Sequence, residues 1–225
     1  GKPELYENLA LAHMQVQQLG PAINVMKQAV IIDPTNARFR SNLGVILLQA
    51  GRWNEAQAQL EAAIRLDSDH SEANNNLGTI LMAQGKYIEA INAFERALRR
   101  RPTYAQAQLN LSRALVLQGR IQEGERSYRA TLELNPQMPE AHLDLGILNA
   151  RLGRLDDAAR HYLDALRYKP DYVKAHYSLG LVYQAQGKFN EAKYRFLQVL
   201  QYDPNFVEAH VAPGAVNDEM GEVKE

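Results

Sequence analysis

Residues 71–104 read SEANNNLGTILMAQGKYIEAINAFERALRRRPTY, and the fold can be predicted from them. Apolar residues recur through it at three- and four-residue intervals, a spacing typical of amphipathic helices. Gly85 stands near the middle, where a glycine can adopt a positive φ and turn one helix into the next. Pro102 stands near the end, where proline stops the second helix. The stretch therefore predicts one helical hairpin.

The same pattern returns every 34 residues, without an insertion, across six units. One hairpin cannot bury its apolar face alone, so neighbouring units must stack on one another. We therefore predict an all-α solenoid of six hairpins over residues 3–206, with units that start near residues 3, 37, 71, 105, 139 and 173. The recurring residues are mid-unit glycines (Gly51, Gly85, Gly119, Gly153, Gly187), first-helix glycines (Gly44, Gly78, Gly146, Gly180), second-helix alanines (Ala22, Ala56, Ala90, Ala158, Ala192) and loop prolines (Pro34, Pro102, Pro136, Pro170, Pro204).

This combination of period and residue columns resembles the tetratricopeptide repeat (TPR) family. The resemblance covers residues 3–206 and implies a right-handed superhelix whose concave surface is lined by the first helix of each unit. Two units depart from the pattern. The first has Ala10 in the small-glycine column and Gly20-Pro21 in place of the mid-unit glycine, and the fourth has Ser112 and Gly124 where Gly and Ala are expected. We expect these departures to soften only the local packing.

Residues 207–225 follow the pattern as a partial seventh unit. Pro213 occupies the leucine column of this unit, so a helix there is expected to kink or end near Ala212. Two interpretations stay open. The segment is either a capping helix over the last complete repeat or the beginning of a longer array.

Composition excludes several classes of protein. The formal net charge of −1 is too small for the counterion displacement that drives non-specific nucleic-acid binding. No apolar run approaches the roughly 18 residues that cross a bilayer, and no basic-then-apolar leader opens the chain. The chain has no cysteine, which excludes disulfides and thiolate metal sites. We expect a soluble protein, cytoplasmic by default, without membrane insertion.

Motifs of catalysis are absent from the sequence. There is no phosphate-binding GxxxxGK[ST] loop, no GxSxG elbow and no HExxH pair. His142, His176 and His210 recur at 34 residues, but equivalent residues of stacked helices lie about 8–10 Å apart and cannot converge on one ion. We expect these histidines to pack between repeats, and we predict a non-catalytic chain without cofactor or metal.

Asparagines form the most informative polar column. Asn8, Asn42, Asn76 and Asn110 are each 34 residues apart, and Asp144 and Ser178 continue the column. An asparagine amide both donates and accepts, so it can pair with a peptide backbone without reading the peptide's sequence. Stacked helices about 8–10 Å apart would place one amide at every third residue of an extended chain, which rises about 3.3 Å per residue. An alternative is that these amides bond a neighbouring helix for packing alone, or reflect shared descent of the repeats.

Two neighbouring columns are placed on the concave surface by the family register. One contains Asn75, Leu109, Leu143 and Tyr177, and the other contains Arg113, Ile147 and Leu181. We expect the surface to become more apolar toward the C-terminal half, where the leucines, Ile147 and Tyr177 would receive ligand side chains. Packing against a terminal helix of another copy is the alternative.

The asparagine row also resembles that of the repeat domain in O-linked N-acetylglucosamine transferases, as do Gln201-Tyr202-Asp203-Pro204 and their surroundings. In those enzymes the row holds extended polypeptide. Three hypotheses follow. The first is a scaffold that binds an extended segment of a protein partner in the concave groove. The others are a substrate-recruiting arm of a larger enzyme such as a protein O-glycosyltransferase, and a scaffold that self-associates through its terminal repeats.

Overall fold

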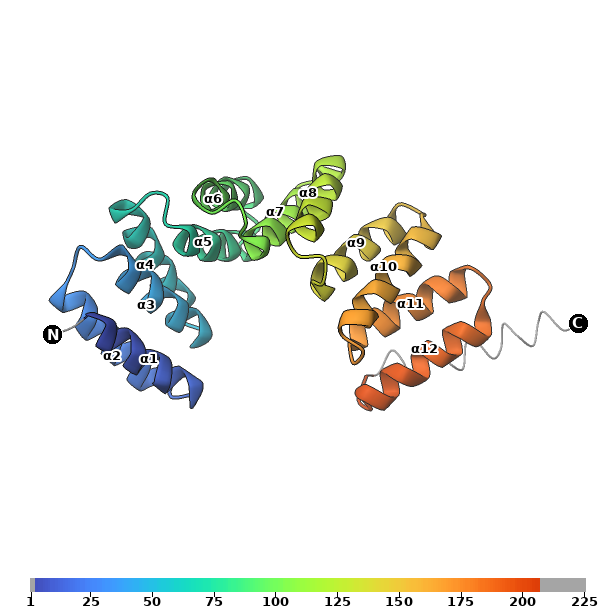
Figure 1. Cartoon of the computed structure of the whole chain (residues 1–225), viewed down its shortest axis with the longest axis horizontal. Helices are drawn as coiled ribbons and strands as arrows, with labels where there is room; N and C mark the ends of the chain where they lie inside the picture. The colour runs from blue at the N-terminus through green and yellow to red at the C-terminus, as the bar shows by residue number, and fades with distance from the viewer. Residues whose placement is uncertain (1–2, 207–225) are drawn as a thin grey trace, which may run out of the picture. The chain divides into compact units, whose positions relative to one another are not determined.

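The computed structural model describes residues 3–206 of the chain, and the predicted partial seventh repeat at 207–225 lies outside the described residues. All regular structure within 3–206 is helical, as predicted, and contains no strand. The helices follow one another as hairpins (Figure 1). Their bounds are α1 Pro3–Gln15, α2 Leu19–Ile32, α3 Ala37–Gln49, α4 Trp53–Leu66, α5 Ser71–Ala83, α6 Tyr87–Arg100, α7 Ala105–Leu117, α8 Ile121–Leu134, α9 Pro139–Arg151, α10 Leu155–Tyr168, α11 Val173–Ala185 and α12 Phe189–Tyr202.

The second, third, fifth and sixth hairpins close because glycine permits two tight features, a turn and a close approach of the paired helices. The mid-unit glycines adopt left-handed backbone, with φ between +71° at Gly51 and +88° at Gly119. The first-helix glycine then lets the second helix approach. A Cβ placed on Gly78 would lie 2.6 Å from the Phe94 ring, and Phe94 is completely buried. The two glycine columns therefore fix the turn and the separation of the paired helices.

The first hairpin turns without a mid-unit glycine. Gln17, which stands at the equivalent position, adopts φ +56° and makes the turn itself. Gly20-Pro21 do not replace the missing glycine as the sequence suggested, because they lie inside the first turn of α2. Proline is tolerated there, since the first amides of a helix have no intrahelical partner.

The fourth hairpin exchanges its two small residues without leaving a polar atom unpaired. Ser112, at the column of the first-helix glycine, is completely buried, and its hydroxyl donates to the Gln108 carbonyl at 2.8 Å and contacts Ser127 Oγ at 2.9 Å. Gly124 makes the room that the alanine column supplies elsewhere, because a Cβ on it would lie 2.5 Å from Val116.

The chain divides into two compact parts, residues 1–127 and 128–225, with the boundary inside α8. In the first part, the described helices α1 to α7 contact one another in order, and the first helices α1, α3, α5 and α7 also contact each other directly. In the second part, α9 to α12 do the same, with α9 against α11. Each part therefore buries its core between successive hairpins, which confirms the predicted helical-repeat solenoid.

Candidate functional site

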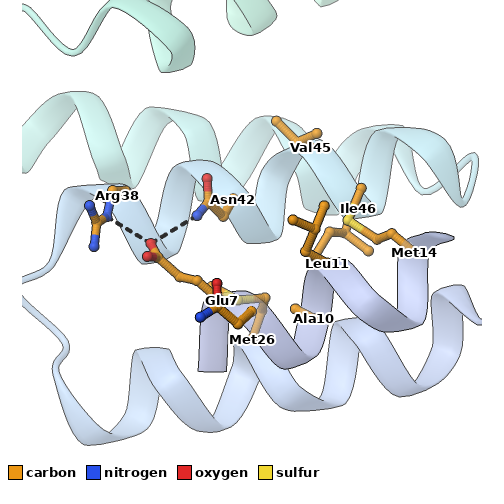
Figure 2. Close-up of a pocket in the computed structure, with 10 residues that line it drawn as sticks. Glu7, Ala10, Leu11, Met14, Met26, Arg38, Asn42, Val45 and Ile46 are labelled. Atoms are coloured by element: carbon orange, nitrogen blue, oxygen red, sulfur yellow. Dashed lines mark hydrogen bonds and ion pairs between the residues drawn. The ribbon is translucent and has the colours of Figure 1, made fainter. Parts of the chain in front are cut away.

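A cavity of about 320 Å³ lies between the first helices α1 and α3 (Figure 2). Its polar residues are Glu7, Asn8, Arg38 and Asn42, and its apolar residues are Ala10, Leu11, Met14, Met26, Val45 and Ile46. Met26 and Ile46 belong to the buried core, whereas half of the Leu11 surface is exposed. The site thus combines a polar rim with an apolar floor, which is the usual composition of a ligand pocket.

The Glu7 carboxylate organises the polar rim (Figure 2). Arg38 Nε lies 2.7 Å from Glu7 Oε1, and Asn42 Nδ2 donates to the same oxygen at 3.1 Å. Arg38 is well exposed, so this ion pair contributes little to stability, of the order of 0–1 kcal/mol. The hydrogen bond from Asn42 to Glu7 orients the Asn42 amide and leaves the amide oxygen as an acceptor.

The asparagine column passes from exposed to buried along the first part of the chain. Asn8 is exposed, and Asn42 and Asn76 are half-buried. Asn110 is only 6% exposed, and its Nδ2 donates to Asn75 Oδ1 at 3.0 Å while its own Oδ1 accepts from Gln106 at 3.2 Å. Asn110 therefore links α7 to α5, and this member of the column serves repeat packing, the alternative that the sequence left open.

The column that precedes the asparagines is largely buried, which corrects the sequence prediction. Leu109 is 0% exposed, Leu143 4% and Asn75 5%, so these three side chains do not line an open surface. For Asn75, one cause is the next repeat, because Asn110 lies against it and donates to its Oδ1. Asn42 makes the equivalent contact with Glu7, which remains half-buried.

A second cavity, of about 300 Å³, lies in the other part of the chain beside α9, α10 and α11. Ile147 and Leu181 line it together with Ser178 and Tyr162. Burial raises the pKa of Tyr162 to about 12, although its hydrogen bond with Ser178 opposes the rise. The phenol is therefore neutral at physiological pH and acts here as packing with one polar atom.

The remaining predicted residues are half-buried. Tyr177 packs its ring against Phe196 and Phe206, with centroids 5.9 Å and 5.1 Å away. Arg113 and Asp144 are also half-buried, and both have interaction partners. Whether any of these three contacts a ligand stays a prediction.

One cluster with metal-ligand chemistry was missed by the sequence argument. A ring nitrogen of His142, a ring nitrogen of His161 and a carboxylate oxygen of Asp164 lie within 4.8 Å of one another. The 34-residue spacing does not reveal this cluster, since His142 and His176 contact separate loop carbonyls. The cluster instead forms inside one hairpin, between positions of different columns.

Comparisons with known proteins define the class of protein. Models of the tetratricopeptide repeat match residues 3–36, 25–58, 43–105, 75–139, 109–173 and 143–192. Together these matches span most of the chain, which therefore belongs to the tetratricopeptide repeat family. Repeats of this family generally mediate protein–protein interaction. No curated protein matches the chain in sequence.

Several solved structures share the fold. PilW, a widely conserved type IV pilus biogenesis factor, aligns with a TM-score of 0.84 and 23% identity over 93% of this chain and 97% of its own. Pseudomonas aeruginosa pilF aligns with 0.81 and 20% identity over 92% and 95%. YrrB, described as a TPR protein with an unusual peptide-binding site, aligns with 0.64 and 23% identity over 83% and 96%. At these identities the likeness shows the fold alone. None of the described helices is long and apolar enough to cross a membrane.

Proposed function

We propose that this chain is a non-catalytic scaffold that holds an extended segment of a partner protein against its first helices. The observation that supports the proposal most is the cavity between α1 and α3. There, Asn8 and Asn42 stand over an apolar floor that includes Leu11 and Val45. The asparagine row itself stays a prediction.

The chemistry of the rim suits a peptide backbone. Asn8 is exposed and offers two donors and an acceptor, and Asn42 offers its oxygen because Nδ2 is held by Glu7. A main-chain amide of the ligand can therefore donate to Asn42, while a carbonyl accepts from Asn8. Neither contact depends on the identity of the ligand side chain.

The floor supplies the selectivity. Leu11 and Val45 present aliphatic surface, and Met14 can adapt its shape because its side chain is unbranched. We expect an apolar ligand side chain to enter the cavity between α1 and α3. The second cavity, lined by Ile147 and Leu181, would receive another apolar side chain of the same or a different segment.

The experiment selects ligands from a displayed library of random peptides and measures affinity by fluorescence anisotropy. The test variant carries Asn8→Ala and Asn42→Ala. The control carries Asn92→Ala, because Asn92 is exposed on the second helix α6 and lies outside both cavities.

We expect the double variant to lose about ten-fold to a hundred-fold in affinity, at roughly 1 kcal/mol or more for each hydrogen bond removed. The control should bind like the unmodified chain. If the selected peptides bind the double variant as well as they bind the control, the proposed site is wrong.

A further inference from the structure

In the second, third, fifth and sixth repeats, one side chain contacts the loop carbonyl six residues before it. This side chain is the fourth residue of the repeat. In two repeats the nitrogen that makes this contact can only donate a hydrogen bond. Arg40 Nε and Asn74 Nδ2 donate to this carbonyl at 3.0 Å and 2.9 Å. In the fifth and sixth repeats the residue is a histidine, with His142 Nε2 2.9 Å from the Pro136 oxygen and His176 Nε2 2.8 Å from the Pro170 oxygen.

This shared contact fixes the proton on the histidine rings. A carbonyl oxygen only accepts, so Nε2 of His142 carries the hydrogen and donates, as the nitrogens of Arg40 and Asn74 do. Nδ1 of the neutral His142 ring is then left with a lone pair. The residue is only 8% exposed, and this Nδ1 has no hydrogen-bond partner among the described residues.

The lone pair points into a group of two further ligand atoms. His142 Nδ1 lies 3.9 Å from Asp164 Oδ2, and the His142 and His161 ring centroids are 5.8 Å apart. His161 and Asp164 lie three residues apart on α10 and so share one face of that helix. Nδ1 of His161 is also buried without a hydrogen-bond partner within the described part of the chain.

We propose that His142, His161 and Asp164 form a binding site for a divalent transition-metal ion of the zinc class. Two imidazoles and one carboxylate are the ligands of borderline ions such as Zn²⁺, whereas Mg²⁺ and Ca²⁺ prefer oxygen ligands alone. A histidine that binds metal through one nitrogen donates the other N–H to a carbonyl or carboxylate, and Pro136 already supplies that carbonyl to His142.

The geometry requires a modest closure. Ligand atoms of a tetrahedral zinc ion lie about 3.3 Å apart, as follows from bonds of about 2.0–2.1 Å. The three atoms here lie within 4.8 Å of one another, so they must approach by up to about 1.5 Å. His142 is held by its loop contact and by stacking on Tyr168, at 5.7 Å between centroids. The closure therefore falls on His161 and Asp164, which are both half-buried and next to solvent.

The sixth repeat is a control built into the chain. His176 repeats the contact to the loop carbonyl and stacks on Tyr202 at 5.6 Å. Its Nδ1, like that of His142, is buried without a hydrogen-bond partner among residues 3–206. The residues equivalent to His161 and Asp164 are Arg195 and Gln198, which do not form a ligand set. Packing thus explains a histidine at the fourth position in both repeats, but it does not explain the second histidine and the aspartate of the fifth.

The experiment titrates Zn²⁺ into the metal-free, untagged chain by isothermal calorimetry, with Mg²⁺ as the hard-ion comparison. The test variant is His161→Arg with Asp164→Gln, which installs the residues of the sixth repeat in the fifth. The control is His176→Asn, which installs the residue that Asn74 shows to fit that position. Circular dichroism of the metal-free proteins checks that each variant is folded.

We expect one Zn²⁺ per chain and no measurable Mg²⁺ binding. Affinity for Zn²⁺ should fall at least about a hundred-fold in the test variant, since two of three ligands are gone, and should change less than about two-fold in the control. Visible absorption of the Co²⁺-loaded chain should show a four-coordinate site that the test variant lacks. The absence of stoichiometric Zn²⁺ binding, or binding that the test variant retains, would overturn the proposal.

Discussion

Replacing Asn110 by alanine should destabilise the chain, whereas replacing Asn8 should not, although the two residues occupy the same column. Removal of the Asn110 amide leaves Asn75 Oδ1 buried without its donor, a loss of about 1–3 kcal/mol. Alanine is the better helix former by up to about 0.7 kcal/mol, which offsets part of this loss. We therefore expect a net loss of roughly 1.5 kcal/mol in the free energy of unfolding. For the exposed Asn8, only the small gain in helix propensity remains.

Urea denaturation monitored by circular dichroism measures this difference. Unfolding of stacked repeats need not be two-state, so hydrogen exchange of the amides in α5 and α7 should locate the effect. A double-mutant cycle of Asn75→Ala and Asn110→Ala isolates the interaction. We expect a coupling energy of about 1 kcal/mol, because the second substitution removes the partner that the first leaves unpaired.

Two results would refute this reasoning. One is an Asn110→Ala variant that is as stable as Asn8→Ala. The other is a cycle whose single effects simply add. Either result would mean that the contact between α5 and α7 does not stabilise the stack, and that Asn110 remains available for a ligand.

Three further predictions concern the glycine columns and pH. Gly146→Ala should lower the free energy of unfolding by about 1–3 kcal/mol, because the added Cβ would lie 2.6 Å from the buried Tyr162 ring. Gly20→Ala should be neutral, since a Cβ there meets nothing within 4 Å, and urea midpoints compare the two variants. Gln17→Gly should raise the stability of the first hairpin by about 1 kcal/mol, measured by hydrogen exchange in α1 and α2, since it relieves a left-handed backbone of φ +56°. The pKa of His176 is lowered, mainly by burial. Its contribution to the melting temperature, measured in chelator, should therefore be constant above the ordinary histidine pKa of about 6.5 and fall as pH drops below it. The variant His176→Gln should show a smaller fall.

The sequence was sufficient to predict the fold because its decisive signals are local. A glycine at φ +75°, as at Gly85, is needed wherever the turn occurs, and its neighbours do not alter that need. The one error in the predicted fold concerns the turn of the first hairpin, and it also reflects a local signal. The turn lies at the usual position, where the non-glycine residue Gln17 adopts a left-handed backbone, and Gly20-Pro21 belong to α2.

The candidate site was less predictable because exposure depends on what the adjacent repeat places on a column. Leu109 shares a column with Glu7, yet Leu109 is fully buried while Glu7 stands in an open cavity. A column fixes the direction of a side chain, whereas its accessibility depends on the residues that pack around it. The family register contains the first kind of information only, and the second required the side-chain contacts.

Departures from a column are therefore more informative than the column itself. The residues at the position of His161 are Gln59 in the second repeat and Ser127 in the fourth, and each contacts the fourth residue of its own repeat, Arg40 at 3.4 Å and Gln108 at 2.7 Å. Each of these pairs matches a donor with an acceptor, which is what packing alone requires. The fifth repeat instead places two imidazoles together, and among residues 3–206 Nδ1 of each has no hydrogen-bond partner. Nδ1 of His176 in the sixth repeat shares the second feature but not the first. An arrangement that packing does not require, beside a carboxylate and next to solvent, is one that a bound cation would complete.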